Sequence, residues 1–464
     1  MNNVTKKYGK LKFVTIVFSF AVIGVYVYDW FHYLGVFHPE SINDIIMYVR
    51  GIRNSGVLRT CFDLATVEGG GYRPRLLAFL IQYYDVEGWI LLNRLTEWGG
   101  HYPFVLVGIP FLVVGGYCTL NKICGEEYKA CNFLIASLFL FEPQYLVTTF
   151  LFCRTAKLLT VGFGICVSVF LWKLKLDRGS RLWRYFKEVS ASFVISLLCT
   201  EDEQLLIIMV VLASIFVIDT FNNKNSWAKV RICFESLVFY EIYYKWWGRI
   251  LFEKYTTVQI VPHFHTFQGA FAELSENMKY GLFVYCNALK YALFNSRISV
   301  IVFVVLFCII LLRCRWKVRL VCLELVISAI VLSGGMVSAH PGIYSIPELS
   351  HGMYFIVGIF MTFIAFIYAA VEAKIESSNR FHIKNWGYIF VLTFWIINFV
   401  YTNVNMKDIS IAFVTHNDVC IIPEKEKGIE NVYSDNDIKA MGINEEYFKG
   451  LLCSEEEYHQ YINR

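Results

Sequence analysis

Hydrophobic residues in this chain form long runs that short polar segments separate. Runs of about 17 to 23 apolar residues have the length of a helix that crosses a bilayer. We predict a membrane-spanning helix at 13–29, 103–119, 131–153, 157–172, 187–200, 204–221, 232–250, 297–312, 319–336, 353–372 and 386–402. The run at 187–200 is short, and Glu142 and Pro143 interrupt the run at 131–153. The pattern therefore predicts an all-α polytopic membrane protein with about eleven transmembrane helices.

Lys and Arg gather in every second connection between these runs. Cytoplasmic loops retain Lys and Arg, whereas short translocated loops lose them. With the N-terminus inside, the segments expected inside hold 22 Lys or Arg and are 1–12, 120–130, 173–187, 222–231, 313–319 and 373–385. The short segments expected outside, 154–157, 200–203 and 337–352, hold only two. We therefore expect the N-terminus inside and the C-terminus outside.

Composition supports the membrane class, because 56% of the residues are hydrophobic and only 17% are charged. The net charge of +4 is explained by the inside clusters, so it indicates membrane orientation rather than nucleic-acid binding. The fourteen cysteines are scattered, without a CxxC or a zinc-like spacing, and we predict no disulfide.

Three long segments fall on the outer side. We divide the chain into a transmembrane domain, 1–402, with outer loops 30–102 and 251–296, and a small acidic tail, 403–464. Apolar residues recur at helical spacing in INDIIMYVRGIRNSGVL, PRLLAFLIQYYDVEGWILLNRL and YGLFVYCNALKYALF, which predicts interfacial helices in both loops. The tail contains a β-like ISIAFVTHNDVCII.

Three carboxylates near the start of the first outer loop are candidates for a general base. Asp29 ends the first span, and Asp44 and Glu68 follow it. A base at the membrane surface suits an acceptor that arrives from outside and a donor that comes from the bilayer. The alternative is that each acid simply faces water.

Five cations on the outer side are candidates for binding phosphate. Arg73 and Arg75 lie in the unusual string EGGGYRPRLL, Arg154 and Lys157 in a very short outer loop, and Arg249 near the end of a span. Arg donors meet phosphate oxygens in pairs. The alternative is contact with lipid headgroups.

The string CTEDEQLL places Glu201, Asp202 and Glu203 between two apolar runs. Each acid in mid-bilayer would cost roughly 2.5 to 3.5 kcal/mol, so we expect a turn at the outer surface. The acids could hold a divalent cation, orient a donor sugar or pair with the first-loop arginines. A plain acidic turn is the alternative.

Histidines supply the remaining candidates for substrate binding. His340, Tyr344 and His351 share one outer loop, and His263 lies in the polar, aromatic stretch of the second long loop. The spacing of these histidines is not that of a zinc motif, so hydrogen bonding to a sugar or phosphate is the expected role.

These features together resemble the GT-C class of integral membrane glycosyltransferases. The resemblance is carried by the acid at the outer end of the first span, the Arg-Pro string, the EDEQ turn and the interfacial helices, and it covers the chain to residue 402. Such enzymes transfer a sugar from a polyprenyl-phosphate-linked donor to a glycan, lipid or protein acceptor outside the cytoplasm.

The resemblance implies roles for individual residues. Asp29, with Asp44 as the alternate, would be the base, and Arg73, Arg75, Arg154 and Arg249 would hold the leaving phosphate. Many members carry two adjacent acids in the first loop, and this chain has no Asp-Asp pair. A metal is optional in this scheme, and a divalent cation at the acidic turn stays open.

Other functions remain possible from the sequence. A polysaccharide polymerase and a lipid-linked glycan transporter are the main rivals, and a noncatalytic scaffold is a third. The expected location is a bacterial plasma membrane, the expected partners are membrane lipid and the lipid-linked donor, and the oligomeric state is open.

Overall fold

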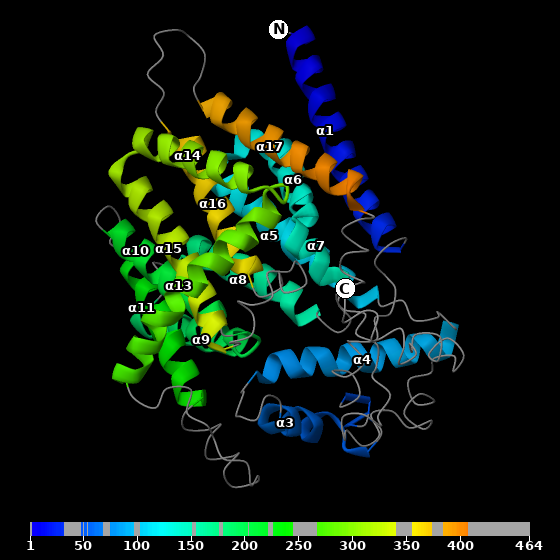
Figure 1. The fold of residues 1–464 in the computed structure, drawn as a ribbon, viewed down its shortest axis with the longest axis vertical. Helices are drawn as coiled ribbons and strands as arrows, with labels where there is room; N and C mark the ends of the chain where they lie inside the picture. The colour runs from blue at the N-terminus through cyan, green and yellow to red at the C-terminus, as the bar shows by residue number, and fades with distance from the viewer. Residues whose placement is uncertain are drawn as a thin grey trace.

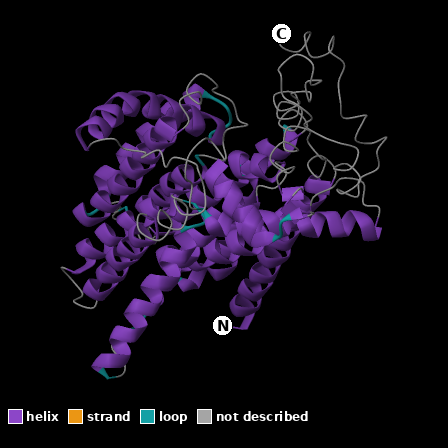
Figure 2. Cartoon of the chain, turned by 90° about the horizontal axis from the view of Figure 1, so that it is seen from below, coloured by secondary structure: helices purple, strands orange, loops and turns teal. Residues whose placement is uncertain are grey.

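The computed structural model describes residues 2–31, 48–49, 51–52, 54–67, 75–96, 103–150, 155–175, 180–202, 204–220, 226–244, 267–339, 355–373 and 384–406. The secondary structure of these residues is helical, without a strand (Figures 1 and 2). The expected all-α class is therefore confirmed for the described residues. The tail beyond Met406, with its predicted β-like segment, lies outside them.

The helices described in the N-terminal half begin with α1 and end with α8. They are α1 (Asn2–Asp29), α3 (Val57–Val67), α4 (Leu76–Thr96), η3 (Pro103–Val107), α5 (Gly108–Cys124), η4 (Glu126–Tyr128), α6 (Lys129–Leu138), η5 (Phe139–Phe141), α7 (Pro143–Phe150) and α8 (Thr155–Lys173). The second half contains α9 (Arg181–Cys199), α10 (Gln204–Thr220), α11 (Ser226–Ile242), α13 (Phe267–Ala292), α14 (Arg297–Arg313), α15 (Trp316–Ala339), α16 (Ile356–Glu372) and α17 (Lys384–Val404).

Several of these helices are apolar enough to cross a membrane. Within the described residues, four meet both the length and the hydropathy expected of a span: Lys12–Asp29, Val105–Cys124, Thr155–Lys173 and Trp316–Met336. Met278–Ala292 and Arg297–Arg313 meet them together, as a pair bent by 99°. These helices indicate membrane association, while the count of eleven spans and the orientation stay predictions.

The helices form one bundle around α16. Helix α16 packs against α15 and α17, and α15 packs along α13. Nearly every side chain of α16 is buried, whereas α14 exposes Ile298, Ile301 and Val305 on its outer surface. A helix that is apolar all round belongs in the interior of such a bundle, and exposed apolar side chains suit contact with lipid.

Helices α3 and α4 lie side by side across one end of the bundle, the end toward which the last turn of α1 points (Figure 1). Helix α4 coincides with the second amphipathic stretch predicted in the first loop, and its crosswise position agrees with an interfacial helix. Of the first predicted stretch, 42–58, the structure describes residues 48, 49, 51, 52 and 54–58, and 48, 49, 51, 52 and 54 are helical. Helix α3 begins only where that stretch ends, at Val57.

The third predicted interfacial stretch, 280–294, belongs up to Ala292 to the longer helix α13, which extends back to Phe267. Here the backbones of α13 and α15 touch, because a Cβ added to Gly281 would lie 2.5 Å from Gly334 Cα. Phe294 and Asn295 then adopt left-handed φ angles of 60° and 49°, and the chain turns into α14.

The predicted span at 131–153 is not one continuous helix. It divides into α6, η5 and α7, with Glu142 in an extended conformation between η5 and α7. Pro143 cannot donate a backbone hydrogen bond and disfavours a helical residue before it. The carboxylate of Glu142 accepts a hydrogen bond from Tyr145 N at 2.7 Å and so caps the first turn of α7.

Candidate functional site

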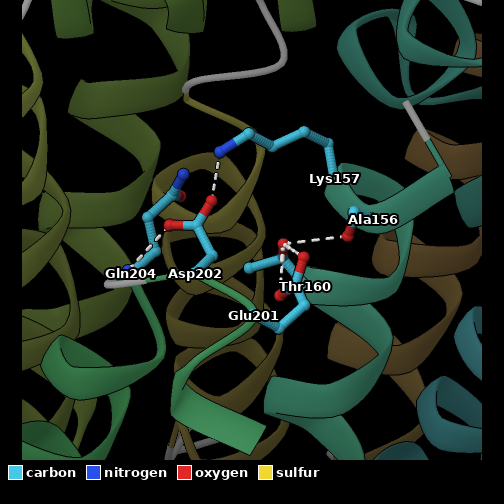
Figure 3. Close-up of polar contacts among 6 residues, drawn as sticks. All are labelled: Ala156, Lys157, Thr160, Glu201, Asp202 and Gln204. Atoms are coloured by element: carbon cyan, nitrogen blue, oxygen red, sulfur yellow. Dashed lines mark hydrogen bonds and ion pairs between the residues drawn. The ribbon is translucent and has the colours of Figure 1, made fainter. Parts of the chain in front are cut away.

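A buried polar cluster lies where α8 and α10 begin side by side. Lys157 belongs to the first turn of α8, and Glu201 and Asp202 form the turn between α9 and α10. Figure 3 shows the Lys157 side chain extended toward Asp202, with Thr160 and Glu201 beneath them. The sequence predicted a turn at these acids, and the boundaries of α9 and α10 confirm it.

Lys157 Nζ and Asp202 Oδ2 form an ion pair. The Lys157 side chain is 11% exposed and that of Asp202 is 1% exposed. Asp202 Oδ1 also accepts a hydrogen bond of 2.9 Å from the backbone N–H of Gln204. This bond satisfies an amide at the start of α10 that has no partner within the helix. Asp202 therefore has both a counter-charge and a hydrogen-bond donor, as a buried carboxylate requires.

Glu201 is held by Thr160, one helical turn beyond Lys157 in α8. Thr160 Oγ1 lies 2.9 and 2.8 Å from the two carboxyl oxygens of Glu201, and 3.2 Å from Ala156 O. A hydroxyl carries a single proton, so it donates to only one of these oxygens at a time. All three short contacts are explained best if Glu201 is protonated, because its O–H can then donate to Thr160 Oγ1 while Thr160 donates to Ala156 O.

The two acids titrate in opposite directions. Burial, reinforced by the neighbouring charge of Asp202, raises the pKa of Glu201 well above its ordinary value of 4.5. Burial also acts to raise the pKa of Asp202, but the cations Lys157 and Arg75, together with its hydrogen bonds, outweigh it and hold that pKa below 3.8. The surroundings therefore favour the protonated form of Glu201 and the ionised form of Asp202.

Arg75 joins this cluster from the first outer loop. It precedes α4, is half-buried, and lies close enough to act on the charges of both Glu201 and Asp202. With Lys157 and Arg75 positive, Asp202 negative and Glu201 neutral, these four side chains carry a net charge of about +1. A partly buried site with surplus positive charge favours an anion such as phosphate.

The structure groups only some of the candidate residues. Arg75, Lys157, Glu201 and Asp202 come together, as proposed for first-loop arginines and the acidic turn. The acids were expected at the outer surface, yet Glu201 and Asp202 are 1% and 0% exposed, because Lys157 and Thr160 cover them. The metal alternative gains no support, since the described residues contain no group of three His, Cys, Asp or Glu that could hold an ion.

Asp29, the first candidate for the base, ends α1 and is 5% exposed. One turn earlier, Tyr26 packs edge-on against Phe141, with ring centroids 5.8 Å apart. Asp29 is therefore held against the bundle rather than facing water. The remaining candidates lie outside the described residues: Asp44, Glu68, Arg73, Arg154, Glu203, Arg249, His263, His340, Tyr344 and His351.

Sequence reasoning missed Thr160 and Gln204. A threonine inside an apolar helix usually donates to its own helix, so nothing in the local pattern distinguishes Thr160. The available signal was its spacing of three residues from Lys157, which places both on one face of α8.

Comparison with known proteins adds no relative, since no family model, curated protein or solved structure matches this chain.

Proposed function

We propose that this protein is an integral membrane glycosyltransferase of the GT-C type. It transfers a sugar from a polyprenyl-phosphate-linked donor to a glycan, lipid or protein acceptor at the outer face of a plasma membrane. In this proposal, the chain crosses the membrane about eleven times, with its N-terminus inside.

The observation that supports this proposal best is the surplus positive charge around Asp202. Lys157 and Arg75 come from segments far apart in the sequence, and both act on one buried carboxylate. Helix α4, which begins directly after Arg75, lies across this end of the bundle. In this proposal α4 lies in the membrane interface and brings Arg75 to the headgroup of the lipid-linked donor.

The charges suit the chemistry of sugar transfer. The phosphate gains negative charge as the bond to the sugar breaks, so fixed cations stabilise the transition state more than the ground state. Lys157 and Arg75 would hold this phosphate, and Asp202 would orient Lys157. Neutral Glu201 would donate its hydrogen bond to Thr160 and would add no second negative charge beside the phosphate. Asp29 or Asp44 would take the proton of the acceptor hydroxyl.

The test is the cell-surface glycan profile of cells that depend on a variant of the full chain. We expect Arg75→Gln and Asp29→Asn each to reduce one glycan at unchanged protein level in the membrane, whereas Glu201→Gln, which keeps a neutral hydrogen-bond donor, should not. Glu126→Gln is the control, because Glu126 forms an exposed ion pair of 2.8 Å with Lys129 between α5 and α6. If all the variants leave every glycan unchanged, catalysis at this face is excluded.

A lipid-linked glycan transporter is the second candidate, and the break between η5 and α7 favours it. Broken helices with a buried ionisable residue line the binding sites of many transporters. Glu142 lies at this break and is 0% exposed. If the protein is a transporter, an inactive variant would leave glycan synthesis on the inner side intact, and the lipid-linked precursor would accumulate in the variant cells. Extraction and mass analysis of polyprenyl-linked lipids from the variant cells would distinguish the two functions.

A further inference from the structure

A largely apolar cavity of about 280 Å³ lies inside the bundle, between α5, α8, α10, α15 and α16. It is roughly twice the volume of an internal cavity, about 150 Å³, that holds a benzene-sized molecule. None of the candidate residues of the proposed site lines it. The proposed transferase chemistry therefore leaves this space unexplained.

The cavity is elongated along the helices. Its walls include Val161 to Trp172 of α8 and Ile208 to Asp219 of α10. Each of these stretches rises roughly 16 Å at 1.5 Å per residue. Its interior is lined by aliphatic and aromatic side chains such as Ile165, Leu212 and Met361. A long, narrow and apolar space fits an alkyl chain better than a compact polar ligand.

One end of the cavity is polar and carries charged side chains. Lys317 and Asp219 line it there, and Trp172 lies beside them. Lys122 Nζ is 5.5 Å from the centroid of the Trp172 ring, and Lys229 Nζ donates a hydrogen bond of 2.9 Å to Trp172 O. Lys317 thus lines this end directly, and Lys122 and Lys229 contact Trp172 beside it. Two carboxylates are near, since Asp219 and Glu372 both act on the wall residue Tyr368, and Ser226 Oγ donates a hydrogen bond to Asp219.

This charged end is opposite to the proposed catalytic end. Lys157 and Asp202 lie at the first turns of α8 and α10, whereas Trp172 and Asp219 lie at their last turns. The Lys and Arg pattern assigns the last turns to the cytoplasmic side, where anionic lipids concentrate and attract basic side chains. In the cavity wall, Thr119 Oγ1 is buried and has no hydrogen-bond partner among the described residues.

We propose that this cavity binds an anionic glycerophospholipid of the cytoplasmic leaflet. One acyl chain occupies the space between α8, α10 and α16, and the phosphate lies among Lys122, Lys229 and Lys317. The apolar walls bind the chain and the lysines select the anionic headgroup, so both features of the cavity are used.

The experiment uses the full-length protein in phosphatidylcholine bilayers that contain a small fraction of phosphatidylglycerol with a photoactivatable acyl chain. After irradiation, peptide mass spectrometry locates the labelled residues. We expect labels on the cavity walls of α8, α10 and α16 in excess of the lipid-facing surface of α14. Unlabelled phosphatidylglycerol should displace the probe more strongly than phosphatidylcholine.

Two sets of variants test the two halves of the proposal. Ser168→Phe and Val321→Phe fill the cavity from opposite walls and should each remove the wall labels, whereas Leu323→Phe, at an exposed position of α15, should not. Replacing Lys122, Lys229 and Lys317 by Gln should weaken binding of phosphatidylglycerol, each lysine contributing roughly fivefold. Replacing Lys12, Arg184 and Lys187 by Gln removes the same charge elsewhere and should leave binding unchanged.

Three results would overturn the proposal. An acyl chain in the cavity is excluded if the cavity walls are not labelled in the natural protein. It is also excluded if the walls stay labelled in both Ser168→Phe and Val321→Phe. Equal displacement by phosphatidylcholine and phosphatidylglycerol excludes an anionic headgroup. Stronger displacement by a polyprenyl phosphate than by phosphatidylglycerol would make an isoprenoid the occupant instead.

Discussion

At the scale of single residues, the Lys157–Asp202 ion pair is the feature with the largest energetic consequences. Removing one partner of a buried pair leaves the other charge without compensation, whereas replacing both partners by apolar residues is often tolerated. The exposures of 11% and 1% place this pair in the buried class. Its contribution to stability can therefore be separated from its contribution to activity.

We predict that Asp202→Asn lowers the free energy of unfolding by about 3 to 5 kcal/mol, because it leaves Lys157 buried without a counter-charge. The double variant Lys157→Met/Asp202→Leu should recover most of this loss while remaining inactive. Asp63→Asn is the control, since the Arg59–Asp63 pair has side chains 61% and 40% exposed and should contribute less than about 1 kcal/mol. Thermal unfolding in detergent measures all three. A double variant no more stable than Asp202→Asn would contradict the prediction.

The raised pKa of Glu201 predicts a specific pH dependence. The folded protein retains a proton on Glu201 that the unfolded chain loses above pH 4.5. The contribution of Glu201 to the free energy of unfolding is therefore largest below pH 4.5. It decreases as the pH rises, by up to about 1.4 kcal/mol per pH unit. Glu201→Gln keeps a neutral group, so its stability relative to the natural protein should increase from pH 5 to pH 8. A constant difference in unfolding temperature across this range would show that Glu201 is ionised in the folded state.

Sequence reasoning identified four of the clustered residues and offered a pairing of the acids with the first-loop arginines, but it did not predict the contact between Lys157 and Asp202. Arg75, Lys157, Glu201 and Asp202 were candidates because charged residues at the ends of apolar runs are conspicuous. Their mutual contacts were not predictable, since Lys157 and Asp202 are 45 residues apart and meet only because α8 packs on α10. The neutral state of Glu201 follows from burial, which no local pattern reveals.

At the scale of elements, each predicted span falls on a helix, because a long apolar run leaves few other ways to satisfy the backbone in a membrane. The exceptions arise from side chains with a local effect. Pro143 and the capping carboxylate of Glu142 divide one run into two helices. Helix α13 begins earlier than predicted, since Glu273 and Glu276 hide its first turns from a search for apolar residues.

Two glycines give a matched test of how closely α13 and α15 pack. We predict that Gly281→Ala destabilises the protein by about 1 to 3 kcal/mol, because the new Cβ would meet the backbone of Gly334, which cannot move aside. Gly335→Ala is the control: no atom lies within 4 Å of its Cβ position, so the change should be neutral or stabilise α15 by up to about 1 kcal/mol. Thermal unfolding of both variants in detergent measures the difference. Equal effects would mean that the two backbones are not in contact.

At the scale of the whole molecule, the arrangement depends on orientation. The proposed catalytic cluster and the charged end of the cavity lie at opposite ends of α8 and α10. If the protein were inserted the other way, the phosphate-binding charges would face the cytoplasm. The distribution of Lys and Arg therefore predicts the topology of the chain, and with it the side of the membrane on which the proposed function takes place.

We predict that green fluorescent protein fused after residue 178 fluoresces, whereas the same protein fused after residue 464 does not. Alkaline phosphatase should give the opposite result, because it folds only after export. The two positions lie on opposite sides of the membrane in the predicted topology. Fluorescence and phosphatase activity in cells measure the outcome, and two fusions on the same side would disprove an odd number of spans between residues 178 and 464.

The parallel course of α8 and α10 has a further electrostatic consequence. Both helices begin beside Asp202, so the positive ends of two helix dipoles lie together at this end of the bundle. Backbone amides at the start of a helix attract anions without any contribution from a side chain. Substitution of Lys157 or Arg75 therefore leaves this part of the field intact, and an anion should retain measurable affinity for the doubly substituted protein. At the other end, Lys229 donates to the carbonyl of Trp172 in the last turn of α8, where the dipole is negative.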